Sequence, residues 1–191
     1  FKLIDRYITG PKGPVFLIKG KIMLKKECVL VIETDGGGIS SYELTEFFRY
    51  FRAAYVAGVK ISESSGISAL SKDKLIRLVN RIKLIQSVDV VDYLFKIDCE
   101  NNELEFLDIQ RENPLSCIIS GSASVLEFVV IFCGATVVSN GVEVKIDEVN
   151  VAGIFKAENV VIKIPPLSKG LNELRAAFGK EAACRKKIDD L

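Results

Sequence analysis

The sequence of 191 residues contains no histidine and no tryptophan, and it has a single methionine. The lack of histidine excludes the catalytic arrangements built on an imidazole, namely the Ser–His–Asp triad, the Cys–His pair and the histidine-ligated zinc site. The phosphate-loop pattern GxxxxGK[ST], the nucleophile motif GxSxG and the CxxC pair are also missing. The sequence therefore favours a protein that is not an enzyme, and we expect no cofactor and no metal. Mechanisms that use only carboxylates or a metal need no imidazole, so catalysis is disfavoured rather than excluded.

The sequence also lacks an excess of either charge, since 26 basic residues face 25 acidic ones and the formal net charge is +1. Nucleic-acid binding proteins usually carry a basic excess, so a nucleic-acid partner is not expected. Hydrophobic residues make up 49% of the chain, enough to fill the core of one domain. No repeat and no long linker divides it. We expect residues 1–191 to form a single compact domain, with residues 98–102 as the one candidate for a loose subdivision.

Cysteine is present in an odd number and at wide spacing. The five residues are Cys28, Cys99, Cys117, Cys133 and Cys184. Four of them have apolar or β-branched neighbours, which is typical of reduced thiols that pack as small hydrophobic groups. The first residues lack the pattern of a secretory signal peptide. Together these features predict a cytoplasmic protein with free thiols.

Short β-branched segments alternate with a few amphipathic ones. The expected strands are 1–8, 15–18, 22–32, 104–110, 115–120, 142–146, 149–155 and 160–164. Helices are expected from residue 43 to 57, from about Ser71 to Ile85, and from Leu167 onward, whereas 87–97 fits either a helix or a strand. Runs of strands and runs of helices, without regular alternation, are typical of an α+β fold. The predicted fold is one or more antiparallel sheets of short strands, packed with about three to four helices.

Local signals set the expected ends of these elements. Ser40 and Glu43 have the spacing of a capping box, which predicts a helix start. Gly58 is the expected end of that helix, and residues 62–71 are expected to form a polar loop. Gly121 is the expected end of the strand pair 104–110 and 115–120.

Residues 122–138 form the longest apolar segment, and only Glu127 in it is charged. A membrane-spanning helix needs about 20 apolar residues, so this segment is slightly short. A carboxylate at bilayer depth also costs about 2.5 kcal/mol or more. The segment therefore favours a buried core element, either helix or strand, and insertion into a membrane is the alternative.

A glycine-rich junction precedes the first helix and is a candidate site for an anionic ligand. Its residues are Asp35, Gly36, Gly37, Gly38 and Ser40. Backbone amides at a helix start favour an anion, and glycines let a ligand approach closely. Asp35 would repel a phosphate, however, so a turn that leads into a capped helix is the favoured interpretation.

Two helical segments offer candidate interaction surfaces. In the first, Phe47, Phe51 and Tyr55 recur at helical spacing, and in the second Arg77 and Arg81 share one side. The acidic pairs Glu33 with Asp35 and Glu103 with Glu105 each share a face of a strand, as the polar side of a half-exposed sheet does by default.

These observations favour a non-enzymatic protein-interaction module, such as an adaptor, a regulatory subunit or an immunity-type protein. Many short strands create sheet edges, so its expected partner is a second copy of itself. The first alternative is a membrane-associated or pore-forming effector that uses segment 122–138. The second alternative is a small enzyme or sensor that binds a phosphorylated ligand at residues 35–41.

Overall fold

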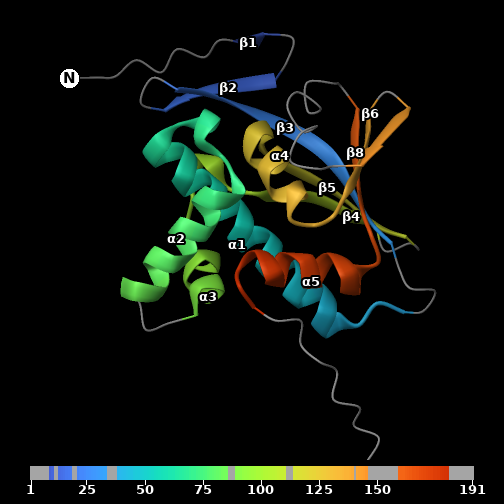
Figure 1. The fold of residues 1–191 in the computed structure, drawn as a ribbon. Helices are drawn as coiled ribbons and strands as arrows, with labels where there is room; N and C mark the ends of the chain where they lie inside the picture. Colours follow the sequence, from blue (N-terminus) through green and yellow to red (C-terminus); the bar gives the residue numbers. More distant parts are fainter. Residues whose placement is uncertain are drawn as a thin grey trace, which may run out of the picture.

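The computed structural model describes residues 9–10, 13–18, 21–33, 38–85, 89–110, 114–139, 141–145 and 159–180. Within them the strands are β1 (Thr9–Gly10), β2 (Gly13–Ile18), β3 (Lys21–Ile32), β4 (Glu105–Gln110), β5 (Leu115–Ser122), β6 (Thr136–Ser139), β7 (Val142–Lys145) and β8 (Val160–Ile164). The helices are α1 (Ser41–Ser65), α2 (Lys72–Ile85), α3 (Val90–Phe95), α4 (Ala123–Ile131) and α5 (Leu167–Ala177), with short 3₁₀ turns at Ile67–Ala69 and Glu100–Asn102. The elements form one compact α+β domain, as the sequence predicts (Figure 1).

Six strands form the main sheet in the order β4-β5-β3-β8-β6-β7. Every neighbouring pair is antiparallel except β3 and β8, which run parallel. The first residues of β3 extend beyond this sheet and pair with β2, which in turn pairs with β1. β3 therefore lies at the centre, and β8 reaches it after most of the chain has been traversed. The expectation of antiparallel sheets is confirmed for every pair but one.

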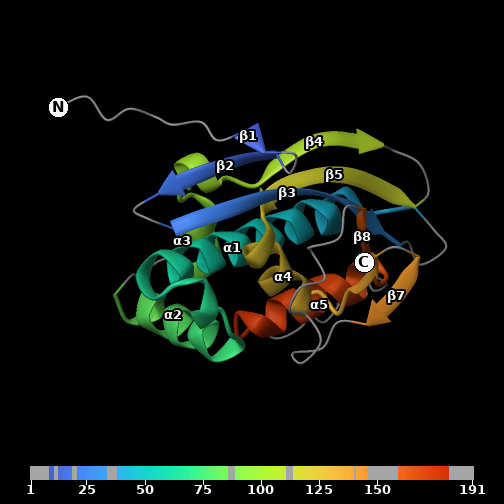
Figure 2. The same cartoon turned by 90° about the horizontal axis from the view of Figure 1, so that it is seen from above.

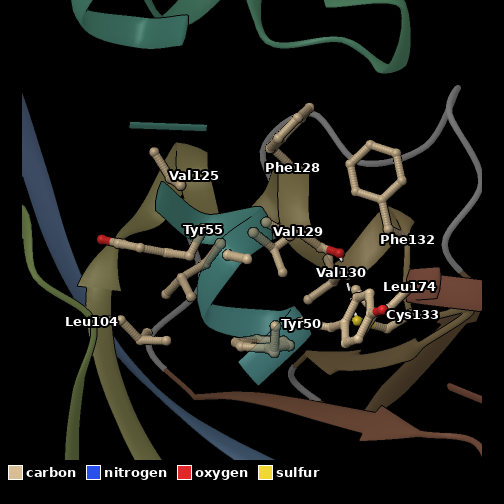
Figure 3. Packing of buried hydrophobic residues seen from close by; sticks show 14 of the residues in the cluster. Tyr50, Tyr55, Leu104, Val125, Phe128, Val129, Val130, Phe132, Cys133 and Leu174 are labelled. Carbon is tan, nitrogen blue, oxygen red and sulfur yellow. Dashed lines mark hydrogen bonds between the residues drawn. The ribbon is translucent and has the colours of Figure 1, made fainter. Parts of the chain in front are cut away.

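The helices form a layer on one face of the sheet (Figure 2). α1 is the central element of that layer, and it contacts α3, α4 and α5. Its fully buried residues include Phe47, Phe51 and Tyr55. Figure 3 shows Tyr55 of α1 near Val125 and Val129 of α4, and Tyr50 of α1 near Leu174 of α5. The core thus lies between the sheet and a helix that is buried along much of its length.

α1 is longer than the sequence predicts, because it continues through Gly58 and ends at Gly66. A Cβ atom at position 58 would lie 2.8 Å from Val125 Cγ1 and 2.9 Å from Phe128 Cδ1. Gly58 therefore allows α4 to approach α1 closely and does not end the helix. The predicted loop 62–71 is wrong for residues 62–65, whereas the start is confirmed, since the Ser40 Oγ accepts a hydrogen bond from the Glu43 amide.

Gly121 also has a different role from the predicted one. β5 continues past it to Ser122, and Gly121 pairs with Lys26 of β3. A Cβ atom at position 121 would lie 2.8 Å from the Tyr55 hydroxyl oxygen. Both glycines that were expected to end elements are instead sites where another element approaches too closely for a side chain.

Segment 122–138 is a core element, as the favoured interpretation predicts, but it changes conformation along its length. α4 covers Ala123–Ile131, and β6 begins at Thr136. Most of its apolar side chains are buried, and Glu127 is half-buried. Among the described residues, no helix has both the length and the apolar character needed to cross a bilayer.

The remaining elements follow the prediction with shifts of a few residues. The strand pair β4 and β5, the helices α2 and α5, and the strand β8 are confirmed. The ambiguous segment 87–97 contains the short helix α3, which Asp89 caps by accepting hydrogen bonds from the amides of Val91 and Asp92. The predicted strands 1–8 and 149–155 lie outside the described residues.

Candidate functional site

β4 is an edge strand whose residues are all exposed to solvent. All six residues from Glu105 to Gln110 are exposed, and they include the large apolar side chains of Phe106, Leu107 and Ile109. Among the strands that the structure describes, only β5 pairs with it. One row of its backbone N–H and C=O groups therefore has no partner in a described strand, which makes this edge a template for a further strand.

The register of β4 on β5 fixes which side chains share a face. Phe106 pairs with Ile119 and Ile109 pairs with Cys117, and the side chains of both β5 residues are buried against the helix layer. Directly paired residues point to the same side of a sheet, so Phe106 and Ile109 lie on the helix side. The ring of Phe106 packs edge-on against Phe48 of α1, with 5.1 Å between centroids.

The register shifts between Phe106 and Asp108, which leaves Leu107 as an extra residue. Such a bulge bends an edge strand and weakens its use as a template. It lies in the middle of β4, and the apolar side chains stand on both sides of it. The bulge therefore alters this edge but does not prevent another strand from pairing along it. We call Glu105–Gln110 the β4 edge, and it is the candidate site.

Polar contacts hold the start of this edge in place. The Arg52 guanidinium of α1 donates to Glu103 Oε1 at 3.0 Å, to the Ile97 carbonyl at 3.0 Å and to the Phe95 carbonyl. Glu103 Oε2 also accepts a hydrogen bond from the Cys99 amide. On the opposite face of the sheet, Lys25 forms an ion pair of 2.8 Å with Glu105. The β4 edge is therefore positioned before any partner binds.

Three of the residues predicted to form an interaction surface lie in the core. Phe47, Phe51 and Tyr55 are each 0% exposed, so the prediction that they form an interaction surface is wrong. The stripe was identified correctly, but α3, α4, α5 and the sheet surround α1 and cover it. The Tyr55 hydroxyl accepts a hydrogen bond of 2.7 Å from the Ser122 amide, and burial raises the pKa of this phenol.

The other predicted surface residues lie where a partner can reach them. Arg77 and Arg81 are exposed on α2. Of the glycine-rich junction, Asp35, Gly36 and Gly37 lie outside the described residues. A Cβ atom at position 38 would meet no other atom within 4 Å, and Ser40 caps α1.

The cysteines that the structure describes are poor nucleophiles. Cys28, Cys99, Cys117 and Cys133 are free and buried. Burial raises the pKa of Cys28 to about 12 and that of Cys117 to about 11. Burial, together with Glu103, raises the pKa of Cys99 to about 11. Since the thiolate is the reactive form, these thiols are inert near neutral pH.

Several charged side chains on the helices or at their ends form ion pairs with one another. Arg49 of α1 binds Glu46 and Asp92 at 2.6 Å each, and Arg175 of α5 lies 3.6 Å from Glu46. Lys180 pairs with Asp89; burial opposes ionisation of that carboxyl, but Lys180 and the cap amides outweigh it and lower its pKa. Within the described part of the chain, no cluster of three or more candidate metal ligands occurs.

The β4 edge itself is absent from the residues predicted as a site. The sequence predicts the strand 104–110. Whether that strand lies at the edge of the sheet depends on which other strands pair with it, and the local sequence does not show this. The available signal was the apolar trio within a short strand that also carries two acidic residues. That pattern fits a half-exposed inner strand equally well.

Comparison of the chain with protein-family models, with curated proteins and with solved structures gives no match. The fold and the site geometry therefore carry the functional inference.

Proposed function

We propose that this protein is a non-enzymatic interaction module that self-associates by pairing β4 of one copy with β4 of a second copy. The observation that carries the proposal is the open β4 edge, with three exposed apolar side chains on a strand that only β5 pairs with among the described strands. Strand addition gives affinity through backbone hydrogen bonds and specificity through the side chains on each face.

The sequence of β4 is compatible with pairing to itself. In an antiparallel dimer with full overlap, Phe106 lies opposite Ile109 of the second copy, and Glu105 lies opposite Gln110. Aromatic side chains opposite β-branched ones stabilise a strand pair. A shift by one residue toward Gln110 would place Asp108 opposite Asp108, and such like-charge pairs are destabilising. The side chains thus favour one register.

A twofold arrangement of this kind closes on itself. Each copy uses its β4 edge, so the dimer pairs the two β4 edges with each other and leaves neither of them for a third copy. The closed dimer therefore buries Phe106, Leu107 and Ile109 without forming a filament. This agrees with a bulged edge that accepts one partner.

The test compares two lysine substitutions at the two ends of the same sheet. Ile109→Lys places a charge in the proposed interface, whereas Val142→Lys places it on β7; these side chains are 51% and 62% exposed, so neither change disturbs the core. Sedimentation equilibrium across micromolar concentrations should show a dimer for the wild type and for Val142→Lys. Ile109→Lys should weaken the dimer by at least about a hundredfold, since each copy loses a buried aliphatic side chain.

Hydrogen exchange locates the interface independently. Amide protection of residues 105–110 should rise with protein concentration in the wild type and stay constant in Ile109→Lys. A wild type that is monomeric throughout this range would contradict the proposal. An equal loss of the dimer in both lysine variants would also contradict it, because the effect would then not be specific to β4.

A further inference from the structure

α2 packs one side on the core and presents a mostly basic side, with one large apolar residue, to the outside. Leu75, Val79 and Ile82 are buried against the rest of the protein. On the opposite side, Arg77, Arg81 and Leu84 follow one another at i, i+4 and i+7, which places them in one stripe along the helix. We call this stripe, together with Ile85, the outer face of α2.

Leu84 is the most exposed large hydrophobic residue that the structure describes, at 88%. Ile85 beside it is 66% exposed, and Ile76 on the flank is also exposed. A helix that packs on a core normally carries polar residues at such positions. Two exposed aliphatic side chains at the end of this helix therefore indicate a second apolar environment.

The charge on this helix is predominantly positive. α2 contains five basic residues and one acidic residue, Asp73, in a chain whose net charge is only +1. Lys83 donates to the Phe178 carbonyl at 3.5 Å and so lies toward α5. Arg77 and Arg81 are exposed and Lys74 is half-buried, and no ion pair is found for these three within the described residues.

The position of α2 in the fold leaves the outer face accessible. Both ribbon views place this helix at the rim of the helix layer, away from the β6 and β7 side of the sheet (Figures 1 and 2). A planar surface can therefore approach it without meeting the sheet.

We propose that the outer face of α2 docks on an anionic lipid bilayer. Basic side chains that flank protruding aliphatic ones are the pattern of a helix that lies in the membrane interface. Leu84 and Ile85 enter the boundary between head groups and acyl chains, and Arg77 and Arg81 contact the anionic head groups. A bilayer, unlike a protein partner, provides no pocket of fixed shape. A side chain that is 88% exposed lies in no groove of its own, which fits an occupant that adapts to it.

The first experiment measures co-sedimentation with vesicles of phosphatidylcholine, with and without 30 mol% phosphatidylserine. The wild type should bind only the anionic vesicles, and added salt should weaken this binding. Arg77→Gln combined with Arg81→Gln should weaken it about twenty-five-fold, because each basic residue near such a surface contributes about a fivefold factor. The control pair, Lys145→Gln with Lys169→Gln, removes the same charge from exposed sites on β7 and α5 and should bind like the wild type.

A conservative pair separates a bilayer from a specific acidic protein site. Arg77→Lys with Arg81→Lys keeps the charge and should bind anionic vesicles within about twofold of the wild type. A protein partner that recognises each arginine through two hydrogen bonds from its planar guanidinium group would bind this variant more weakly. That loss would overturn the proposal in favour of a protein partner.

The second experiment uses the absence of tryptophan from the chain. Leu84→Trp introduces a single fluorophore at the proposed point of insertion, and Tyr42→Trp introduces one at a residue of α1 that is 67% exposed. Anionic vesicles should shift the emission of Leu84→Trp to shorter wavelength, and brominated lipid should quench it, whereas Tyr42→Trp should show neither change. An unchanged Leu84→Trp spectrum, or equal changes in both variants, would overturn the proposal.

This inference does not depend on the β4 dimer. The monomeric variant Ile109→Lys keeps the outer face of α2 and should still bind anionic vesicles, with lower avidity because it presents one face instead of two. Loss of vesicle binding in the α2 variants should leave the dimer intact. The two proposals therefore fail separately.

Discussion

The two edges of the six-stranded sheet differ in length, in composition and in their attachment to the core. β4 has six residues and exposes Phe106, Leu107 and Ile109, while β7 has four residues, Val142–Lys145, that alternate apolar and charged. β7 carries a lysine and a glutamate, and Glu143 pairs with Lys163 of β8 at 3.4 Å. Short strands and lysines are known devices that prevent edge-to-edge pairing. β7 has both devices and β4 has neither.

The two edges also differ in their attachment to the rest of the protein, and β4 is the more firmly held. Arg52 of α1 holds the segment that leads into β4, and Phe48 packs on the Phe106 ring. Beyond its pairing with β6, β7 makes the exposed ion pair of Glu143 with Lys163 of β8. A six-residue edge without lysine that is held rigidly suits a binding role despite its bulge, because a preorganised strand loses less entropy when a partner pairs with it.

The largest expected effect comes from adding one methyl group beside each edge. In Gly121→Ala, the new Cβ would meet the buried Tyr55 hydroxyl at 2.8 Å, which strains the ring and disturbs its hydrogen bond with Ser122. We expect a loss of about 3 kcal/mol in the free energy of unfolding. Gly141→Ala, in the turn before β7, has open space around it and meets only the penalty of its φ of +79°, about 1 kcal/mol. Urea denaturation measures both, and an equal cost would show that the β4 side is not the more tightly packed one.

A smaller effect is expected when the cation next to each edge is removed. Arg52→Met keeps the aliphatic packing but leaves Glu103 and two carbonyls without their donor, which should cost about 2 kcal/mol. Lys163→Met breaks an exposed pair and should cost about 0.5 kcal/mol or less. Thermal and urea unfolding of the two variants would check this difference. If Lys163→Met were the more destabilising change, the two edges would not differ in attachment as described.

The sequence predicts the elements well because their signals are local. The capping residue Ser40, the apolar stripe of α1 and the β-branched strands all appear in the structure near their predicted positions. The predictions for Gly58 and Gly121 are wrong because a glycine that ends an element and a glycine that admits a neighbour look the same in sequence. Only the positions of Val125 and Tyr55, far away along the chain, distinguish the two cases.

The candidate site was less predictable for the same reason. Phe47, Phe51 and Tyr55 were correctly placed on one stripe, yet that stripe is buried because elements distant in sequence cover it. The β4 edge exists because β3 pairs with β5 and β8, which leaves β4 outside. Leu84 lies on the side of α2 opposite Leu75, Val79 and Ile82, so its exposure follows from the side of the helix that packs on the core.

The smallest expected effect tests whether the charged side chains alone prevent β7 from pairing with a further strand. Glu143→Val combined with Lys145→Val, made in the monomeric Ile109→Lys background, turns β7 into a run of four valines. Four residues offer fewer backbone hydrogen bonds than six, and no aromatic side chain stands opposite a β-branched one, so we expect association to strengthen by only a few fold. Sedimentation equilibrium should thus show a protein that stays largely monomeric at micromolar concentration. A dimer as tight as the wild type would mean that charge, and not length, is the feature that separates the two edges.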